Sequence, residues 1–249
     1  MPTVPRPFPA AMPHGALSEP LPGIFFVKGT MQLPAPVPMR FSRNMVIVQE
    51  GKRLVLINTV RLDESGLSAL DALGKVTDVV RIAGNHGMDD PFYADRYKAK
   101  VWAVKGQRYV AGLGAAGPDV YFESDEQMAP GGPLPIEGAT LHLIRSRPPE
   151  ALLRLPQHGG VIVAGDCLQH WAKSDPYWSF PARIAMPLLG FVKPHNVGPA
   201  WFKGCKPPKE DLAAILELPF SHVLPAHGEP VIDDAVSKYR PAIERLTSP

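Results

Sequence analysis

Three short apolar runs in this chain end in clusters of acidic and imidazole side chains. The runs occupy residues 79–83, 161–164 and 220–224, and each has the length and composition of a buried strand. The clusters that follow them contain His86, Asp89, Asp90, Asp166 and His227. Mixed α/β enzymes usually place their chemistry at strand ends, because the strand fixes the backbone while the loop side chains converge. These endings therefore indicate where the chemistry of this chain lies.

Each of these polar residues also has a structural interpretation. Asp89-Asp90-Pro91 is typical of a helix start, with Asp90 as the N-cap and Pro91 in the first turn. Asp166 would also serve to cap a turn after its strand, and His86 to form a loop hydrogen bond. For Asp166 a site role is favoured, whereas for His86 the two interpretations stay open.

The rest of the pattern predicts two sheets with helices outside them. Residues 44–49 and 54–57 read as strands around a turn that contains Gly51, which predicts a hairpin. Leucines three residues apart predict a helix over residues 65–73. Further strands are expected at residues 24–27, 77–83, 100–104, 140–145, 151–155, 161–164 and 221–224, and further helices from residue 91 and over residues 209–218 and 233–246. Strands come in runs first and alternate with helices later, which favours a layered α/β (α+β) fold.

This order of elements and endings resembles the metallo-β-lactamase superfamily. Three motifs carry the resemblance: the hairpin at residues 44–57 followed by a helix, the strand ending in Gly165-Asp166, and the strand ending before His227 and Gly228. The resemblance implies a four-layer αββα sandwich, with metals held at the shared edge of two sheets. We expect a Pro-rich N-terminal arm at residues 1–22 and one metallo-β-lactamase-like domain at residues 23–249.

The sequence departs from the superfamily in its main metal-binding motif, His-x-His-x-Asp-His. The ungapped match fills the four ligand positions with Asn85, Gly87, Asp89 and Asp90. The resemblance then implies a one-metal site whose ligands are Asp89, Asp90, Asp166 and His227. Three oxygen ligands and one imidazole suit one Zn, Fe or Mn ion. A shifted register, in which His86 replaces a lost ligand, is equally compatible with the spacing.

The segment at residues 170–208 is rich in proline and aromatic residues and has no clear period. A loop this long in a compact domain is usually functional or packs as its own small helices. If it folds over the site, its pocket-lining residues would be His195, Trp171 and Trp201; packing on the surface is the competing interpretation. Residues 184–192 are predicted to join the core, with a dimer contact and a membrane-facing patch as the alternatives.

Composition limits the partners. Of 249 residues, 45% are hydrophobic and 20% are charged, and the formal net charge is +2. This near-neutral charge, without a basic stripe, argues against nucleic acid as a partner. No apolar run is long enough for a transmembrane helix, and two cysteines make no disulfide framework, which together favour a cytoplasmic protein. A homodimer is compatible with the sequence, and the oligomeric state stays open.

Two functions follow from the resemblance. The first is a metal-dependent hydrolase of a small-molecule substrate, in which His86 or His170 assists proton transfer. A metal at such a site lowers the pKa of bound water and supplies a nucleophile. The second is a non-catalytic, metal-free member that binds a small-molecule ligand or serves as a scaffold, and the degenerate motif motivates it. The residues alone neither decide between these functions nor name the substrate.

Overall fold

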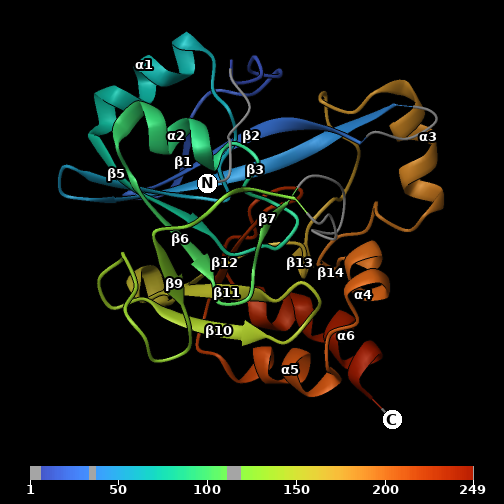
Figure 1. Cartoon of the computed structure of the whole chain (residues 1–249). Helices are drawn as coiled ribbons and strands as arrows, with labels where there is room; N and C mark the ends of the chain where they lie inside the picture. The colour runs from blue at the N-terminus through green and yellow to red at the C-terminus, as the bar shows by residue number, and fades with distance from the viewer. Residues whose placement is uncertain (1–6, 34–37, 111–118, 249) are drawn as a thin grey trace.

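The computed structural model describes residues 7–33, 38–110 and 119–248, and its strands form two main sheets (Figure 1). The larger sheet has seven strands in the order β1-β2-β3-β4-β5-β6-β9. Its first four strands pair antiparallel, whereas β4, β5, β6 and β9 run parallel. The strands are β1 (Ser18–Leu21), β2 (Ile24–Leu33), β3 (Met39–Glu50), β4 (Arg53–Ile57), β5 (Lys75–Arg81), β6 (Lys100–Val104) and β9 (Glu126–Met128).

The smaller sheet has four strands, in the order β10-β11-β12-β15. They are β10 (Thr140–Ile144), β11 (Glu150–Leu155), β12 (Val161–Ala164) and β15 (His222–Pro225). β12 and β15 are parallel neighbours, with Val161 opposite His222 and Ala164 opposite Pro225. Because the two strands end at the same edge, the residues that follow them come together there. Two further pairs are short: β7 (Tyr109–Val110) with β8 (Val120–Phe122), and β13 (Leu168–Gln169) with β14 (Asn196–Val197).

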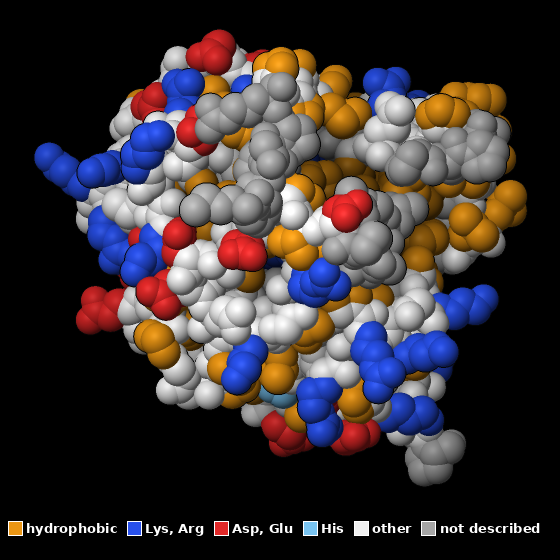
Figure 2. Space-filling view, viewed as in Figure 1, with side chains coloured by type: hydrophobic (Ala, Val, Ile, Leu, Met, Phe, Trp, Pro, Cys, Tyr) orange, Lys and Arg blue, Asp and Glu red, His pale blue; other side chains and the backbone are white. Residues whose placement is uncertain are grey.

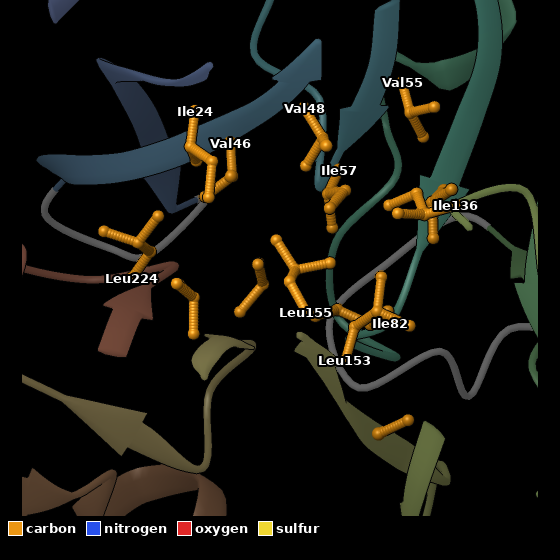
Figure 3. Close-up of a cluster of buried hydrophobic side chains, with 14 of the residues drawn as sticks. Ile24, Val46, Val48, Val55, Ile57, Ile82, Ile136, Leu153, Leu155 and Leu224 are labelled. Atoms are coloured by element: carbon orange, nitrogen blue, oxygen red, sulfur yellow. The ribbon is translucent and has the colours of Figure 1, made fainter. Parts of the chain in front are cut away.

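The two sheets pack face to face because their strands are apolar on both sides. In β3, Val46 and Val48 join the core between the sheets, while Met45 and Ile47 join the core under the outer helices. Figure 3 shows the inter-sheet core, where residues of the larger sheet face Leu153 and Leu155 of β11 and Leu224 of β15. This alternation is what strands buried on both faces require.

Helices cover both outer faces (Figure 1). The larger sheet is covered by α1 (Glu64–Leu73) and α2 (Asp90–Tyr97). The smaller sheet is covered by α5 (Lys209–Ala213), which continues as the 3-10 helix η3 (Ala214–Glu217), and by α6 (Ala235–Thr247). A further 3-10 turn, η2 (Gln157–Gly159), joins β11 to β12. The layers are therefore α, β, β and α, which confirms the predicted fold class.

The N-terminal segment is built into the larger sheet over its described part. Residues 1–6 of the predicted arm lie outside the described residues, but Ser18–Leu21 pairs with β2 as the edge strand β1. The Phe8 ring packs edge-on against Phe92 of α2, and His14 Nε2 accepts a hydrogen bond from Asp63 N. A short strand and two side-chain contacts thus tie this Pro-rich stretch to the domain.

Residues 168–208 form a small unit of their own beside the sheets. It contains the β13–β14 pair, α3 (Phe180–Leu188) and α4 (Pro199–Cys205). Trp171, Trp178 and Met186 pack with Phe41 of β3, while Ser179 N donates to Arg40 O. The prediction that residues 184–192 join the core is correct for Met186 but wrong for Ile184 and Leu188 on the opposite face and for Leu189 at the helix end. Ile184, Leu188 and Leu189 are 52%, 83% and 60% exposed, because no other described element packs over them.

The structure bears on two further features considered in the sequence analysis, namely membrane-spanning helices and disulfide bonds. No helix in the described ranges is long and apolar enough to cross a membrane. Both cysteines, Cys167 and Cys205, are buried free thiols, so neither contributes a disulfide.

Candidate metal centre

Three side chains from three strand ends meet where the two sheets share an edge. His86 follows β5, Asp166 follows β12 and His227 follows β15. Asp166 Oδ1 lies 2.8 Å from His227 Nε2 and 3.3 Å from His86 Nε2, and the two Nε2 atoms are 3.3 Å apart. All three residues are buried. Within the described residues, this is the one group of three or more His, Cys, Asp or Glu side chains that could share a metal ion.

The loop after β5 presents His86 through a tight turn. His86 N donates to Ala83 O, and Gly87 has a φ of +89°, in the left-handed region that favours glycine. The Arg81 guanidinium donates to the carbonyls of Ala83 and Gly84, so these buried acceptors are satisfied. Gly84 itself lies so close to Pro148 that a Cβ there would be 2.3 Å from the proline ring. The backbone around His86 is therefore fixed from two sides.

Asp166 is oriented by its neighbours. Asn85 Nδ2 donates to Asp166 Oδ2 at 3.2 Å, which leaves Oδ1 facing the two imidazoles. Burial alone raises the pKa of the Asp166 carboxyl, but the charges and hydrogen bonds of His86 and His227 outweigh it and hold that pKa well below its usual range. Burial lowers the pKa of His86, although the Asp166 charge opposes this effect. The surroundings of Asp166 thus favour its carboxylate form, and burial favours the neutral form of the His86 imidazole; both are the forms that bind metals.

His227 has the orientation of a metal-binding imidazole. Its Nδ1 lies 3.0 Å from the backbone carbonyl of Ser42, so Nδ1 carries the proton of the neutral ring and Nε2 faces the site with a lone pair. Asn44 Nδ2 donates to Pro225 O and Gly228 O and so ties β3 to the His227 turn. Gly228 has a φ of +95°, and a Cβ there would meet His170 O at 2.0 Å. Both β3 and the following turn therefore hold His227 in place.

The donor set fits a single transition-metal ion. Two imidazoles and one carboxylate form a common ligand set for catalytic zinc and for non-haem iron. The three ligand atoms lie 2.8–3.3 Å from one another, close enough to share one ion. The fixed direction of His227 Nε2 adds to this fit.

The structure does not bring Asp89 and Asp90 into this group. The Asp89 carboxylate pairs with the Arg43 guanidinium and accepts from Arg61 N at 2.8 Å. Asp90 is fully buried and accepts from Thr59 Oγ1 and from Tyr109 Oη at 2.6 Å. Both acidic side chains are thus already satisfied at the start of α2 and take no part in the cluster. The shifted register, with His86 at the site, matches the observed geometry.

His170 and His195 stack on one another away from the cluster. Their ring centroids are 4.3 Å apart, and His195 N donates to His170 Nδ1 at 3.1 Å. Tyr239 of α6 lies edge-on against His195. The backbone of His170 does contact the site, because His170 N donates to His227 O, but its side chain points the other way. Neither ring lines the pocket described below.

We expect His170 to make the fold sensitive to acid. Partial burial, and then the nearby His195, lower the pKa of His170 from 6.5 to about 4. As the pH falls from 6.5 towards 4, the unfolded chain binds a proton that the native protein does not, so the unfolding free energy falls. Because His170 is only half-buried, we expect a loss of about 1–2 kcal/mol. Urea denaturation at pH 7 and pH 5, with chelator present, measures it.

The matched controls are His170→Gln and His158→Gln, the latter in the exposed 3-10 turn η2. His170→Gln should remove the His170 share of the pH dependence, about 1–2 kcal/mol, while the part that comes from the lowered pKa values of His86 and Asp166 remains. His158→Gln should leave the pH dependence unchanged. An equal acid sensitivity in the parent and in His170→Gln would show that this residue is not its source.

A pocket of about 470 Å³ opens above the cluster. His86, Asp166 and His227 lie at its floor, and two of the three predicted wall residues, Trp171 and Trp201, lie in its wall. The other lining residues are mostly apolar and include Met31, Leu33, Phe41, Met88, Met186 and Phe191. Phe41 and Trp171 also contact the His227 ring, at centroid distances of 5.9 and 5.2 Å. The pocket thus combines apolar walls with one polar floor.

Several site residues were not singled out from the sequence. Ser42, Arg43 and Asn44 are buried polar residues at consecutive positions of an otherwise apolar strand. Ser42 and Asn44 hold the His227 turn, whereas Arg43 pairs with Asp89 outside the cluster. Glu150 lies behind Asp166 and accepts from Cys167 N at 2.7 Å, while burial and then the Asp166 charge raise its pKa to about 8. In β3, the run of polar residues inside an apolar strand was a sequence signal that could have identified these residues. No comparable signal in the sequence pointed to Glu150.

Comparison with known proteins places the fold. No protein-family model matches the chain, and no curated protein matches it. The solved metallo-β-lactamase FIM-1 from Pseudomonas aeruginosa, in its mono-zinc form, is similar with a TM-score of 0.61 at 12% identity, over 97% of this chain and 99% of that one. A metallo-β-lactamase from Hirschia baltica is similar with a TM-score of 0.57 at 16% identity, over 95% of this chain and 99% of that one. A metallo-β-lactamase from Erythrobacter litoralis is similar with a TM-score of 0.55 at 13% identity, over 93% of this chain and 89% of that one. The chain therefore has the metallo-β-lactamase fold.

Proposed function

We propose that this protein is a metal-dependent hydrolase with one metal ion held by His86, Asp166 and His227. The observation that carries the proposal is the convergence of three buried ligand atoms, each 2.8–3.3 Å from the others, at the floor of a pocket. This set replaces Asp89 and Asp90, which the sequence suggested, with His86. FIM-1 was solved with one zinc, which supports a one-ion site on this fold.

In the proposed reaction, water is activated at the metal ion, and the residues of the protein position the ligands and bind the substrate. A bound Zn, Fe or Mn ion would act as a Lewis acid and lower the pKa of water at the site. Asn85 holds the second oxygen of Asp166, and the Ser42 carbonyl holds the far side of His227. The walls formed by Phe41, Trp171 and Trp201 bind the apolar part of a small-molecule substrate and exclude bulk water.

The runner-up function is a metal-free binding module, and one observation favours it. Asp166 Oδ1 already lies within hydrogen-bond distance of both imidazoles, so rings protonated at Nε2 would pair with this carboxylate in the absence of an ion. In that case the pocket would hold a small-molecule ligand and carry out no reaction. We place the protein in the cytoplasm, since both cysteines are free, and this location holds for either function.

The test is elemental analysis of protein purified without chelators or a metal-affinity column, followed by reconstitution with Zn, Fe(II) and Mn. We expect close to one ion per chain, and metal-dependent turnover of at least one ester, thioester, lactam or phosphodiester. No binding of any of the three ions would overturn the hydrolase proposal and leave the binding module. Stoichiometric metal without turnover would contradict hydrolysis of the screened bonds but support the ligand set.

A further inference from the structure

Helix α3 is apolar on two opposite faces, and only one of them is buried. Ala182 and Met186 face the core under the helix, with exposed fractions of 0% and 2%. Phe180, Ile184 and Leu188 follow at a spacing of four residues on the opposite face, because an offset of two residues turns a helix by about 200°. Their exposed fractions are 75%, 52% and 83%, and Leu189 adds 60% at the helix end. We call these four residues the α3 ridge.

The ridge is prominent on the surface. Figure 2 shows hydrophobic side chains gathered over α3 at the upper right, with Lys or Arg side chains at their edge. Across the described residues, the large hydrophobic side chains that are exposed are the four of the ridge and Met88. Grouping on one helix distinguishes this set from the scattered apolar residues that every surface carries.

The charge around the ridge has one sign. Residues 176–208 contain four basic residues, namely Arg183, Lys193, Lys203 and Lys206, and no acidic residue. This local excess stands out in a chain with 26 basic and 24 acidic residues in all. Arg183 and Lys193, which flank the ridge, are exposed, and none of the ion pairs among the described residues involves either side chain. Arg183 Nε donates to Trp178 O at 3.1 Å, so its charge has a carbonyl partner but no acidic one. An apolar ridge bordered by cations without acidic partners complements an anionic lipid surface.

The ridge also adjoins the pocket. Met186, on the buried face of α3, and Phe191, just beyond the helix, both line the pocket wall. Met88, the one other exposed large hydrophobic residue among those described, lines it as well. A surface that covers the ridge therefore lies next to the pocket, where an amphiphile could pass from one to the other.

The size of the ridge argues against a second copy of the chain as its partner. The largest apolar patch on an ordinary monomer is about 300–600 Å², whereas a standard stable interface buries about 800 Å² on each partner. Three side chains on a helix of nine residues and one at its C-cap belong to the first range. We propose that the α3 ridge docks this protein on the surface of an anionic lipid bilayer, with Phe180, Ile184, Leu188 and Leu189 inserted among the acyl chains. This docking goes beyond the proposed hydrolysis and does not depend on it.

The test is co-sedimentation of the full chain with phosphatidylcholine vesicles that contain 0 or 30 mole per cent phosphatidylserine. We expect binding that rises with phosphatidylserine and weakens at high salt. The double variant Phe180→Asp/Leu188→Asp should reduce partitioning by about tenfold or more. The double variant Arg183→Glu/Lys193→Glu should reduce it by about tenfold as well, and mainly on the anionic vesicles. All four side chains are exposed, so Phe180→Asp/Leu188→Asp should keep the parent melting temperature. Arg183→Glu/Lys193→Glu also loses the Arg183 hydrogen bond to Trp178 O and should melt within about 2–4 °C of the parent.

The matched controls change charge elsewhere on the surface. Ala69→Asp lies on the exposed face of α1, and Lys52→Glu/Lys75→Glu lies near the turn that follows β3. Both controls should bind vesicles as the parent does. Absence of binding to anionic vesicles, or equal loss in the controls, would overturn the proposal. So would a solution dimer that Leu188→Asp dissociates, since the ridge would then be a contact between copies.

Discussion

Replacing Asp166 with alanine is expected to abolish stoichiometric metal binding by this chain. The carboxylate supplies one of three ligand atoms, and its charge is the one negative charge among the three. We expect the affinity for Zn to fall by more than about a hundredfold, and any metal-dependent turnover to fall with it. Isothermal titration with Zn, together with elemental analysis of the purified variant, measures the loss. His227→Ala and His86→Ala should behave in the same way.

Graded variants separate loss of a ligand from loss of the fold. Asn85→Ala removes the hydrogen bond to Asp166 Oδ2 but no ligand, so we expect a smaller loss of affinity, about 10- to 100-fold. His170→Ala removes a side chain that faces away from the site and should keep one ion per chain. Metal content at the parent level in Asp166→Ala, with circular dichroism unchanged, would contradict the ligand set.

The second large effect concerns Asp89, whose replacement should destabilise the fold without removing metal. Asp89 pairs with the buried Arg43 guanidinium, which also donates to Thr59 O. Asp89→Asn leaves that guanidinium without a counter-charge, and we expect a loss of about 3 kcal/mol in unfolding free energy. Metal content below the unfolding temperature should stay at the parent level. Chemical denaturation and elemental analysis of the same preparation give both quantities.

The partner residue supplies the control for Asp89. Arg43→Met should destabilise the protein to a similar degree, and the double variant Arg43→Met/Asp89→Asn should lose less than the two single variants together, because the two charges are removed as a pair. Loss of metal from Asp89→Asn alone, with the fold intact, would instead identify Asp89 as a metal ligand. It would then favour the ligand set expected from the sequence motif, which includes Asp89 and Asp90.

The fold could be predicted from sequence because its signals are local and repeated. Runs such as residues 44–57 and 161–164 combine strand-length apolar stretches with turn residues, and they became β3, β4 and β12. Helix α3 was not predicted, because Phe180–Leu188 is apolar on both faces and contains two prolines, so no helical period stands out. The burial of residues 184–192 was inferred from hydrophobicity, which cannot tell whether another element packs over a helix.

The site was predicted in part, for an equally physical reason. Asp166 and His227 each follow directly after a strand, so the sheet fixes their positions. His86 and Asp89 lie on the loop before α2, and Asp90 is the first residue of that helix. In such a loop, one residue of shift turns a side chain to the opposite side. The partners that decide the matter are Arg43, Thr59 and Tyr109, which are distant in sequence and draw both aspartates away from the pocket. Spacing alone carries no information on those partners.

The parallel pairing of β12 with β15 makes the positions of Asp166 and His227 independent of the chain segment that connects them. Asp166 and His227 follow neighbouring strands, so their separation is set by backbone hydrogen bonds within the sheet. The chain between them, which contains α3 and α4, leaves the sheet and returns to it. Its length and composition can therefore diverge over evolution without moving either side chain. The pocket wall and the α3 ridge can change in that segment while Asp166 and His227 stay where they are.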